Sequence, residues 1–309
     1  MSYKSNLDKV TRTSEADDFP EVVLIDNLNA CNLKCSMCDH KNIKNFRPIQ
    51  KMEFDLYKRI IDEVAVINPG ARIWEIFYGD PFLCIDMADR IKYAKEKDLT
   101  DVVLNSNGVL MVKEKAEAYI KAGLDTMYVG IDSSTEENYN KIRVGGDYKK
   151  AVKNVLNYRD LLSQHGNGKQ QIFVQFVKSD INEHEVEDFR NFWTKNGINV
   201  KIRPKVSWGG LIEATNLRNN SEVKRKPCFW LMRTINICAD GEIAFCSVDV
   251  HCRIKCGNIK QHSIRELWRG KLRQYREMHK QSRFDELPKM CRECADWQSS
   301  YAEYSISQL

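Results

Sequence analysis

Hydrophobic residues in the first two thirds of the chain follow two alternating periods. Short runs rich in β-branched residues predict strands at Val22–Leu28, Arg72–Tyr78, Asp101–Asn105, Thr126–Asp132, Gln171–Val177 and Ile198–Arg203. Between the strands, apolar residues recur at helical spacing, as at Phe54, Tyr57, Ile61 and Val64. Strands that alternate with helices indicate parallel βα units, because a parallel crossover needs a helix to return the chain. The pattern predicts an α/β fold, a partial (β/α)6 TIM-like barrel that stays open.

The pattern changes after a polar stretch at residues 216–226. Ile235–Ala239 and Glu242–Ser247 flank Asp240-Gly241, a pair typical of a two-residue hairpin turn. A helix is predicted over residues 263–280, and the remaining residues are irregular and rich in cysteine. We therefore expect an N-terminal extension, a barrel and a smaller C-terminal cysteine-rich domain, at residues 1–20, 21–215 and 216–309.

The composition of the 309 residues narrows the classes of protein. Hydrophobic residues make up 42% and charged residues 29%, which is typical of a globular chain and not of a disordered one. Neither a membrane-spanning apolar run of ~18 residues nor the apolar core of a signal peptide is present, so we expect a cytoplasmic protein without a membrane partner. The net charge of +5 is spread along the chain, and no nucleic-acid partner is expected.

The first cluster among the eleven cysteines comprises Cys31, Cys35 and Cys38, directly after the first predicted strand. In a chain without a secretory signal, clustered cysteines more often bind metal than form disulfides. Three thiolates at these spacings suit a 4Fe–4S cluster that leaves one iron open for chemistry. A zinc site closed by His40 or by a remote residue is the alternative, since structural zinc normally takes four protein ligands.

The pattern Cys31-x-x-x-Cys35-x-x-Cys38 after the first strand of a βα barrel resembles the radical S-adenosylmethionine (radical SAM) superfamily. In that family the open iron chelates the amino and carboxylate groups of SAM, and reduction yields a 5′-deoxyadenosyl radical. The resemblance implies a SAM-binding 4Fe–4S cluster, SAM itself, and an electron donor of the flavodoxin or ferredoxin type.

Further segments resemble the SAM-binding motifs of the family. Tyr78–Pro81 is similar to its G-G-E-P segment, although a tyrosine replaces the first glycine and an aspartate replaces the glutamate. By resemblance, Arg143 reaches the SAM carboxylate and Met37 lies near the adenine. The resemblance implies cofactor contacts at the ends of successive strands, from Met37, Gly79, Asp80, Pro81, Asn105, Ser106, Asn107, Asp132, Ser133 and Arg143. Taken singly, the glycine-containing segments could be ordinary turns and Arg143 a solvated charge at a helix end.

A second set of cysteines lies in the C-terminal third. Cys228, Cys246 and Cys291-x-x-Cys294, with Leu267-Trp268 between them, resemble the auxiliary-cluster domain called SPASM in its shorter twitch form. The spacing is most similar to that of the twitch enzyme that oxidises 2-deoxy-scyllo-inosamine. The resemblance implies one auxiliary 4Fe–4S cluster bound by Cys228, Cys246, Cys291 and Cys294. A structural zinc ion on the same four thiolates is the alternative.

Strand alternation separates the other cysteines from this set. A two-residue turn would pair Cys238 with Ile243, which puts Cys238 and Cys246 on opposite faces of the hairpin. We therefore expect Cys246 to be the ligand and Cys238, like Cys84, to be a small buried residue. Cys252 and Cys256 are either loop cysteines without a role or thiols that donate a hydrogen atom to a substrate radical.

Candidate substrate contacts lie on the last predicted strand of the barrel. Lys201 and Arg203 alternate there with aliphatic residues, so both are expected to point into the barrel, together with Gln175 and Glu75. Buried charges need partners, so these groups favour a polar or anionic substrate. The alternative is an edge strand whose polar face contacts water.

The resemblance implies radical oxidation of a hydroxyl-bearing carbon in a polar small molecule, of the sugar or aminocyclitol type. A base would take the hydroxyl proton, and the auxiliary cluster would accept the remaining electron. The alternatives are an epimerase with Cys252 or Cys256 as hydrogen donor, a maturase of ribosomal peptides, and a zinc-stapled binding protein without redox chemistry.

Overall fold

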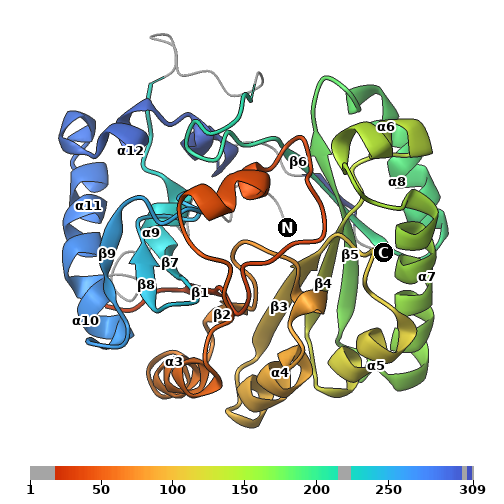
Figure 1. Cartoon of the computed structure of the whole chain (residues 1–309), viewed down its shortest axis with the longest axis horizontal. Helices are drawn as coiled ribbons and strands as arrows, with labels where there is room; N and C mark the ends of the chain where they lie inside the picture. Colours follow the sequence, from red (N-terminus) through yellow and green to blue (C-terminus); the bar gives the residue numbers. More distant parts are fainter. Residues whose placement is uncertain (1–17, 215–223, 301–304, 308–309) are drawn as a thin grey trace.

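The computed structural model describes residues 18–214, 224–300 and 305–307. Its strands form one ten-stranded sheet in the order β10-β6-β5-β4-β3-β2-β1-β7-β8-β9 (Figure 1). The first six strands pair in parallel and in chain order, with bounds β1 Val22–Ile25, β2 Arg72–Trp74, β3 Asp101–Ser106, β4 Thr126–Gly130, β5 Gln171–Lys178 and β6 Asn199–Pro204. The predicted partial barrel of parallel strands is confirmed.

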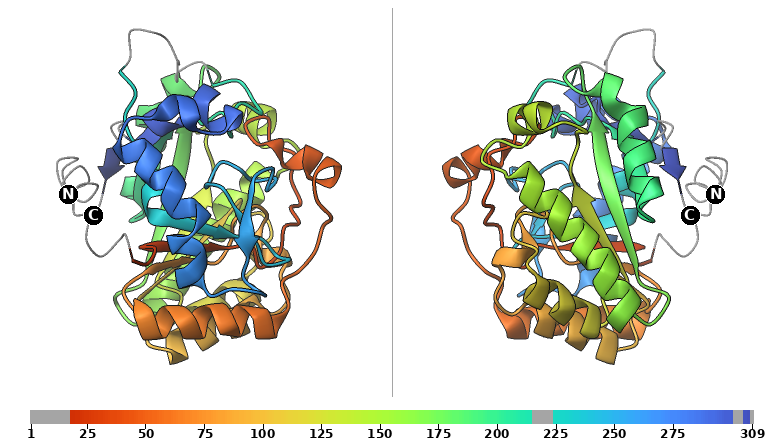
Figure 2. Two further views of the ribbon diagram at one scale, coloured as in Figure 1. Left: turned by 90° about the vertical axis from the view of Figure 1, so that its left-hand side faces the viewer. Right: turned by 90° about the vertical axis from the view of Figure 1, so that its right-hand side faces the viewer.

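Helices and short 3₁₀ turns return the chain between these strands (Figures 1 and 2). Their bounds are η1 Asp39–Asn45, α3 Phe54–Ile67, η2 Pro81–Leu83, α4 Met87–Glu96, α5 Lys113–Lys121, α6 Glu136–Ile142, α7 Tyr148–His165, η3 Glu183–Glu185 and α8 Val186–Lys195. The predicted period is visible in α3, which buries five apolar side chains against the sheet. Among the described helices, none combines the length and the apolar character needed to cross a membrane.

The cysteine-rich part of the chain continues the barrel sheet at both edges. On one side β7 (Thr234–Ile237) pairs in parallel with β1, followed by the antiparallel strands β8 (Glu242–Ala244) and β9 (Lys255–Asn258). On the other side β10 (Ser305–Ser307) pairs antiparallel with β6. The remaining elements are α9 Phe229–Arg233, α10 Ile264–Arg269, α11 Lys271–Lys280, η4 Phe284–Glu286, α12 Lys289–Glu293 and η5 Asp296–Ser300. The expected domain boundaries at 20/21 and 215/216 stay predictions. Residues 1–17 and 215–223, most of the expected extension and linker, lie outside the described residues.

The single helix predicted over residues 263–280 is wrong, because the chain breaks at Gly270. Ser263 and Glu266 form a capping box that begins α10. Gly270 then takes φ −80° and ψ −125°, outside the helical region, and its N–H closes α10 on the Glu266 carbonyl. The chain re-enters a helix at Lys271, so two short helices replace one long one.

The predicted register of the β7–β8 hairpin is wrong by one residue. Ile237 pairs with Ile243, and the four residues 238–241 between the ends of β7 and β8 form a loop that is closed by the Gly241 N–H on the Cys238 carbonyl. A two-residue type I′ turn needs positive φ at both central residues. Only Gly241 of the Asp240-Gly241 pair has one, at φ +88°. The glycine therefore ends the loop instead of forming its centre.

Strands β1 and β2 end earlier than predicted because a buried polar network begins there. Asn27 Nδ2 donates to Glu75 Oε2 at 2.6 Å, and the Tyr57 hydroxyl lies 2.5 Å from Glu75 Oε1. Arg90 Nη1 donates to Asn27 Oδ1 at 2.9 Å. Burial raises the pKa of Glu75 to about 7, against the lowering effect of these hydrogen bonds. Glu75 thus faces α3 and α4, so the expectation that it points into the barrel is wrong.

Replacing Arg90 tests how strongly this network supports the barrel. Arg90 is fully buried and also donates to the Met52 carbonyl and the Asp86 carboxylate. We expect Arg90→Ala to lower the free energy of unfolding by about 3 kcal/mol or more, because several buried acceptors lose their donor. Lys92→Ala on the exposed side of α4 is the control and should cost at most about 0.5 kcal/mol. Urea unfolding of the two variants checks this, and equal costs would contradict the role of the network.

Candidate functional site

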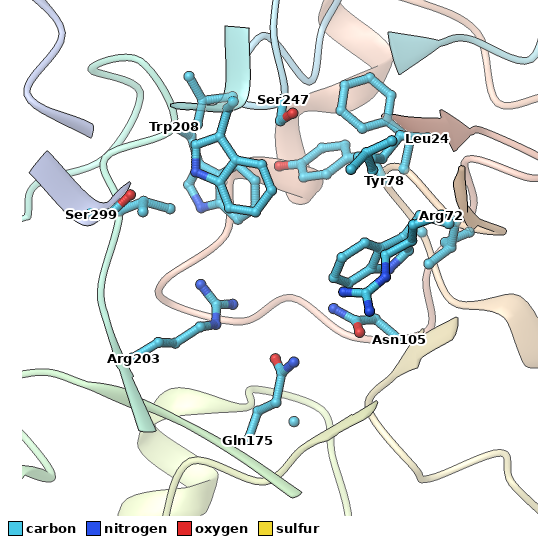
Figure 3. A pocket seen from close by; sticks show the side chains of 18 of the residues that line it. Leu24, Arg72, Tyr78, Asn105, Gln175, Arg203, Trp208, Ser247 and Ser299 are labelled. Carbon is cyan, nitrogen blue, oxygen red and sulfur yellow. The ribbon is translucent and has the colours of Figure 1, made fainter. Parts of the chain in front are cut away.

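A cavity of about 1440 Å³ lies along the inner side of the barrel sheet (Figure 3). Its wall brings together residues from the loops and strand ends of all six barrel strands. Among them are thirteen of the residues singled out from the sequence: Cys31, Cys35, Met37, Cys38, Gly79, Asp80, Asn105, Ser106, Asn107, Arg143, Gln175, Lys201 and Arg203. The segment that carries the cysteines stands at one end of the barrel (Figure 2). This is the end at which βα barrels build their sites.

The backbone of the three-cysteine loop is fixed on the side away from the cavity. The Lys34 N–H donates to the Val144 carbonyl and the Ser36 N–H to the Ile142 carbonyl, both at 2.9 Å. Burial raises the pKa of Cys31 to about 12 and that of Cys38 to about 11. Such thiols stay protonated until a metal binds, because a coordinating thiol must lose its proton. Three thiols that share one open cavity fit the donor set of a cluster with one free iron.

The Gly79-Asp80 segment joins the ends of β1, β2 and β3. A Cβ atom at Gly79 would lie 2.5 Å from the Leu28 carbonyl oxygen, so only glycine fits there. The buried Asp80 carboxylate accepts hydrogen bonds from the Ser106 hydroxyl, from the Asn107 backbone and side chain, and from the Phe82 N–H. Burial raises the pKa of Asp80 while these hydrogen bonds oppose the shift. The Asp80 side chain therefore fixes the shape of the loop. Pro81 follows as the first residue of η2.

Arg143 crosses the cavity wall between the fourth strand and the cysteine loop. Its Nε donates to Asp132 Oδ2 at 2.6 Å, and its Nη1 lies 3.7 Å from Cys35 Sγ. A Cβ atom at Gly130 would clash with this guanidinium, which explains the glycine at the end of β4. Asp132, at φ +61°, also accepts from the Val177 N–H. Asp132 and Ser133 are buried behind the wall, where the Ser133 hydroxyl donates to Glu185.

Two residues of the cavity wall, Asn105 and Trp208, carry polar groups close to where a cofactor would bind. The Asn105 Oδ1 atom is buried and, within the described part of the chain, has no hydrogen-bond partner. Figure 3 shows this side chain pointing into the cavity, where a bound molecule could satisfy it. Trp208, which the sequence patterns did not single out, donates from Nε1 to the Met37 carbonyl at 2.9 Å. A tryptophan in a loop gives no pattern from which this contact could be predicted.

Polar side chains line the cavity beside a packed aromatic cluster. Trp74, Tyr128 and Phe173 form this cluster, and Trp74 also lines the cavity. Gln175 and Arg203 point inward in Figure 3, and Lys201 Nζ lies 4.9 Å from the centre of the Tyr128 ring. Burial lowers the pKa of Lys201 to about 7, and the charges of Arg203 and Arg72 add to the shift. Lys201 and Arg203 therefore line the barrel interior, as the alternation predicts.

The four C-terminal cysteines surround a second, small cavity. Cys228, Cys246, Cys291 and Cys294 all line it. Trp230 and Val248 line both this cavity and the large one, so the two are neighbours. Within the described residues, no group of three or more Cys, His, Asp or Glu side chains converges on a single-ion site. Four thiols around one small cavity suit a 4Fe–4S cluster or a zinc ion by donor chemistry alone.

The sequence did not single out two further residues at this second site. Arg225 Nη2 donates to the Cys291 carbonyl at 2.6 Å and lies 3.5 Å from its sulfur. His279 Nε2 also lies 3.5 Å from Cys291 Sγ. Arg225 precedes Cys228 and His279 lies in α11, so the spacing of these residues along the chain does not predict their contact with Cys291.

The other four cysteines line neither of the two cavities. Cys84 and Cys238 are buried, as expected, but the hairpin register that supported this reading of Cys238 is wrong. Cys238 contacts Cys252 instead of Cys246. Cys252 and Cys256 are both buried, at 9% and 5% exposure, and neither lines the large cavity. These positions count against a hydrogen-donating thiol at the substrate.

Curated relatives share the barrel part of the chain. A protein of Methanococcus maripaludis (strain C5 / ATCC BAA-1333) named probable GTP 3′,8-cyclase is 28% identical over 172 residues, 56% of this chain and 54% of that protein. The GTP 3′,8-cyclase of Lactiplantibacillus plantarum is 24% identical over 231 residues, 74% of this chain and 64% of that protein. The chain thus spans less than two thirds of the length of either relative.

Solved structures share the fold over most of the chain. BtrN in complex with AdoMet and 2-DOIA aligns with a TM-score of 0.60 at 16% identity, covering 89% of this chain and 92% of that chain. Streptococcus suis SuiB bound to precursor peptide SuiA aligns with a TM-score of 0.70 at 13% identity, covering 94% and 74%. At these identities the likeness shows the fold alone.

Two family descriptions match the chain itself. Residues 228–295 match SPASM, an iron-sulfur cluster-binding domain, and so contain all four cysteines of the second cavity. Residues 28–192, just over half of the chain, match the radical SAM superfamily and contain the three-cysteine loop. The chain therefore belongs to the radical SAM superfamily, with a C-terminal SPASM domain.

Proposed function

We propose that this protein is a radical SAM oxidoreductase that acts on a polar small molecule in the barrel cavity. The observation that carries the proposal is the single cavity that joins the three thiols to the polar side chains of Gln175, Lys201 and Arg203. Cys31, Cys35 and Cys38 would hold the SAM-binding cluster. When bound and reduced by a flavodoxin- or ferredoxin-type donor, cluster and SAM together supply a 5′-deoxyadenosyl radical that takes a hydrogen atom from the substrate.

Residues at the thiol end of the cavity would bind and orient SAM. The Gly79-Asp80 backbone and the Asn105, Ser106 and Asn107 turn lie in the cavity wall beside the cysteines. Arg143 would meet the SAM carboxylate from its place between Asp132 and Cys35. Met37 is fixed through its carbonyl by Trp208, next to the expected adenine. Asp132, Ser133 and Pro81 lie behind this wall and would act by shaping it.

Lys201 is the proposed base that takes the hydroxyl proton of the substrate. A general base works best when its pKa lies near the working pH, and burial brings the pKa of Lys201 to about 7. The side chain lies in the cavity wall, over the Tyr128 ring. Arg203, on the same face of β6, would hold the substrate in place.

The SPASM cysteines would hold a cluster beside the substrate. Trp230 and Val248 form part of both cavity walls, so only a thin layer of protein separates the two sites. An auxiliary 4Fe–4S cluster at Cys228, Cys246, Cys291 and Cys294 would take up the second electron of a two-electron oxidation. This arrangement favours oxidation over an epimerase mechanism, for which Cys252 and Cys256 lie in the wrong place.

The charge of the cavity wall bears on the substrate class. Arg203 and Lys205 line it in addition to the proposed base Lys201, and Arg72 lies there with its partner Asp101. A wall with excess positive charge favours a neutral or anionic polyhydroxyl compound over a protonated amine. We therefore propose a sugar or sugar phosphate in preference to an aminocyclitol.

A second candidate is a radical reaction on a purine nucleotide. The curated relatives are named for cyclisation of GTP and not for oxidation of a sugar. A triphosphate would suit the basic wall of the cavity. This candidate has weaker support because the chain covers only 54% and 64% of the lengths of those relatives. A peptide substrate has weaker support, because SuiB shares only the fold.

Metal analysis with cysteine variants tests the two clusters. After anaerobic reconstitution, we expect about eight iron atoms per chain, four in each cluster. Cys35→Ala should lose about half of the iron and the EPR change on adding SAM. Cys291→Ala should also lose about half of the iron but keep the SAM response. A colourless protein that binds zinc and no iron would contradict the enzyme function altogether.

A substrate panel separates the candidate reactions. Reduced protein and SAM are incubated with sugars, sugar phosphates, aminocyclitols and GTP, and 5′-deoxyadenosine and substrate products are measured by mass spectrometry. We expect a product two hydrogen atoms lighter from a neutral or anionic sugar. A cyclised GTP product would establish the second candidate instead. Solvent deuterium at one carbon of an otherwise unchanged substrate would identify an epimerase.

The pH dependence of product formation tests the role of Lys201. The pKa of Lys201 is lowered, so the neutral amine forms as the pH rises through about 7. We expect kcat/KM to rise with pH through that range and then level off. The Lys201→Met variant should lose this rising limb of the pH profile. Glu75→Gln is the matched control, because the pKa of Glu75 is also about 7 but this carboxyl lies outside the cavity. If Glu75→Gln loses the rising limb and Lys201→Met keeps it, the titrating group is Glu75 and not Lys201.

A further inference from the structure

Tyr78 stands where the family motif has a glycine, directly beside the three-cysteine loop. Its side chain is only 4% exposed, and its hydroxyl oxygen lies 3.3 Å from Cys38 Sγ. In the described structure the Cys38 thiol donates to this hydroxyl. As a thiolate the sulfur can only accept, so the Tyr78 O–H would then donate to it. Figure 3 shows the Tyr78 ring in the cavity wall next to Trp208.

We propose that Tyr78 donates a hydrogen bond to the Cys38 thiolate and thereby raises the reduction potential of the SAM-binding cluster. The inference deepens the proposed function, because it takes Cys38 to be a cluster ligand. A hydrogen bond to a ligand sulfur draws electron density from the cluster and stabilises the reduced, more negative state. Reduction is a one-electron step, with the electron supplied by an external donor such as dithionite, and the tyrosine proton stays on its oxygen.

The position of Tyr78 is fixed by packing on several sides. Its ring centre lies 5.7 Å from those of Trp208 and His251, and 5.2 Å from that of His40. Its backbone N–H donates to the buried Asp26 carboxylate at 3.4 Å. A side chain held in this way loses little conformational freedom when it donates.

Other side chains near the cysteine loop have partners of their own, although the backbone N–H of His40 also donates to Cys38. His40 Nε2 lies 2.8 Å from the Asn29 carbonyl oxygen, which occupies that nitrogen. The Arg143 guanidinium approaches Cys35 at the longer distance of 3.7 Å and is paired with Asp132. Tyr78 is therefore a tuning residue separate from the groups expected to bind SAM. Its removal should change the cluster more than the cofactor pocket.

Redox titration of Tyr78→Phe tests the proposal. The reconstituted holoprotein is titrated anaerobically, following the EPR signal that responds to SAM, which distinguishes this cluster from the auxiliary one. We expect the midpoint potential to become more negative by about 59 mV, a tenfold change in the equilibrium of a one-electron couple. Tyr158→Phe is the matched control. Tyr158 is buried in α7, its hydroxyl has no hydrogen-bond partner in the described structure, and the variant should leave the potential unchanged.

If the Tyr78→Phe protein fails to hold its cluster, a second variant still tests the proposal. Incorporating 3-fluorotyrosine at position 78 keeps the shape and strengthens the donor, so the midpoint should move to a less negative value. An unchanged potential in both proteins, with the SAM-responsive signal intact, would overturn the proposal. A wild-type protein with iron but without any SAM-responsive signal would instead refute the proposed function, so the two failures are distinguishable.

Discussion

The architecture of the site depends on one constraint: the three thiols of the cysteine loop must be held in place while the side of the loop that faces the cavity stays accessible. The backbone of the cysteine loop is bonded on one side to residues 142 and 144, while the three sulfurs face the cavity. Gly79 lies so close to the Leu28 carbonyl that no side chain fits between them. Asp80 then binds the neighbouring strand end through Ser106 and Asn107. The loop is hydrogen-bonded to the protein on one side, and its three cysteines line the cavity on the other.

The C-terminal part of the chain is built onto the barrel through the same sheet. The parallel pairing of β7 with β1 brings the SPASM cysteines to the side of the barrel that already carries the cysteine loop. One result is the shared wall of Trp230 and Val248 between the two cavities. Another is an aromatic contact region in which the His251 ring stacks on the exposed Phe46 ring and meets the buried Tyr78 ring edge-on. The sheet extension thus sets the distance between the proposed redox centres.

The sequence predicted those features that follow from a local period or spacing. Alternation on the sixth strand placed Lys201 and Arg203 in the barrel, and the cysteine spacing placed three thiols together. The sequence-based prediction failed where a single backbone dihedral angle or a long-range contact determines the local structure. The φ and ψ angles of Gly270 split a predicted helix, and the non-positive φ of Asp240 moved the hairpin register.

Side-chain direction beyond the end of a strand was also unpredictable. Strand alternation pointed Glu75 inward, but β2 ends at Trp74, and Glu75 joins Tyr57 and Asn27 on the outer side. The partners of Cys238 and Cys252 come from separate loops, and their contact leaves no trace in the spacing. Tyr78 could be recognised from the sequence as a departure from the family motif. Its contact with Cys38 needed the fold.

The central claim is that SAM binds directly to an iron held by Cys31, Cys35 and Cys38. Electron-nuclear double resonance of the reduced protein with SAM labelled by ¹⁵N at the amino group and ¹⁷O at the carboxylate tests it most directly. The account predicts hyperfine coupling of both labels to the cluster, lost in Cys35→Ala. A reduced cluster that shows no coupling to either label would contradict it.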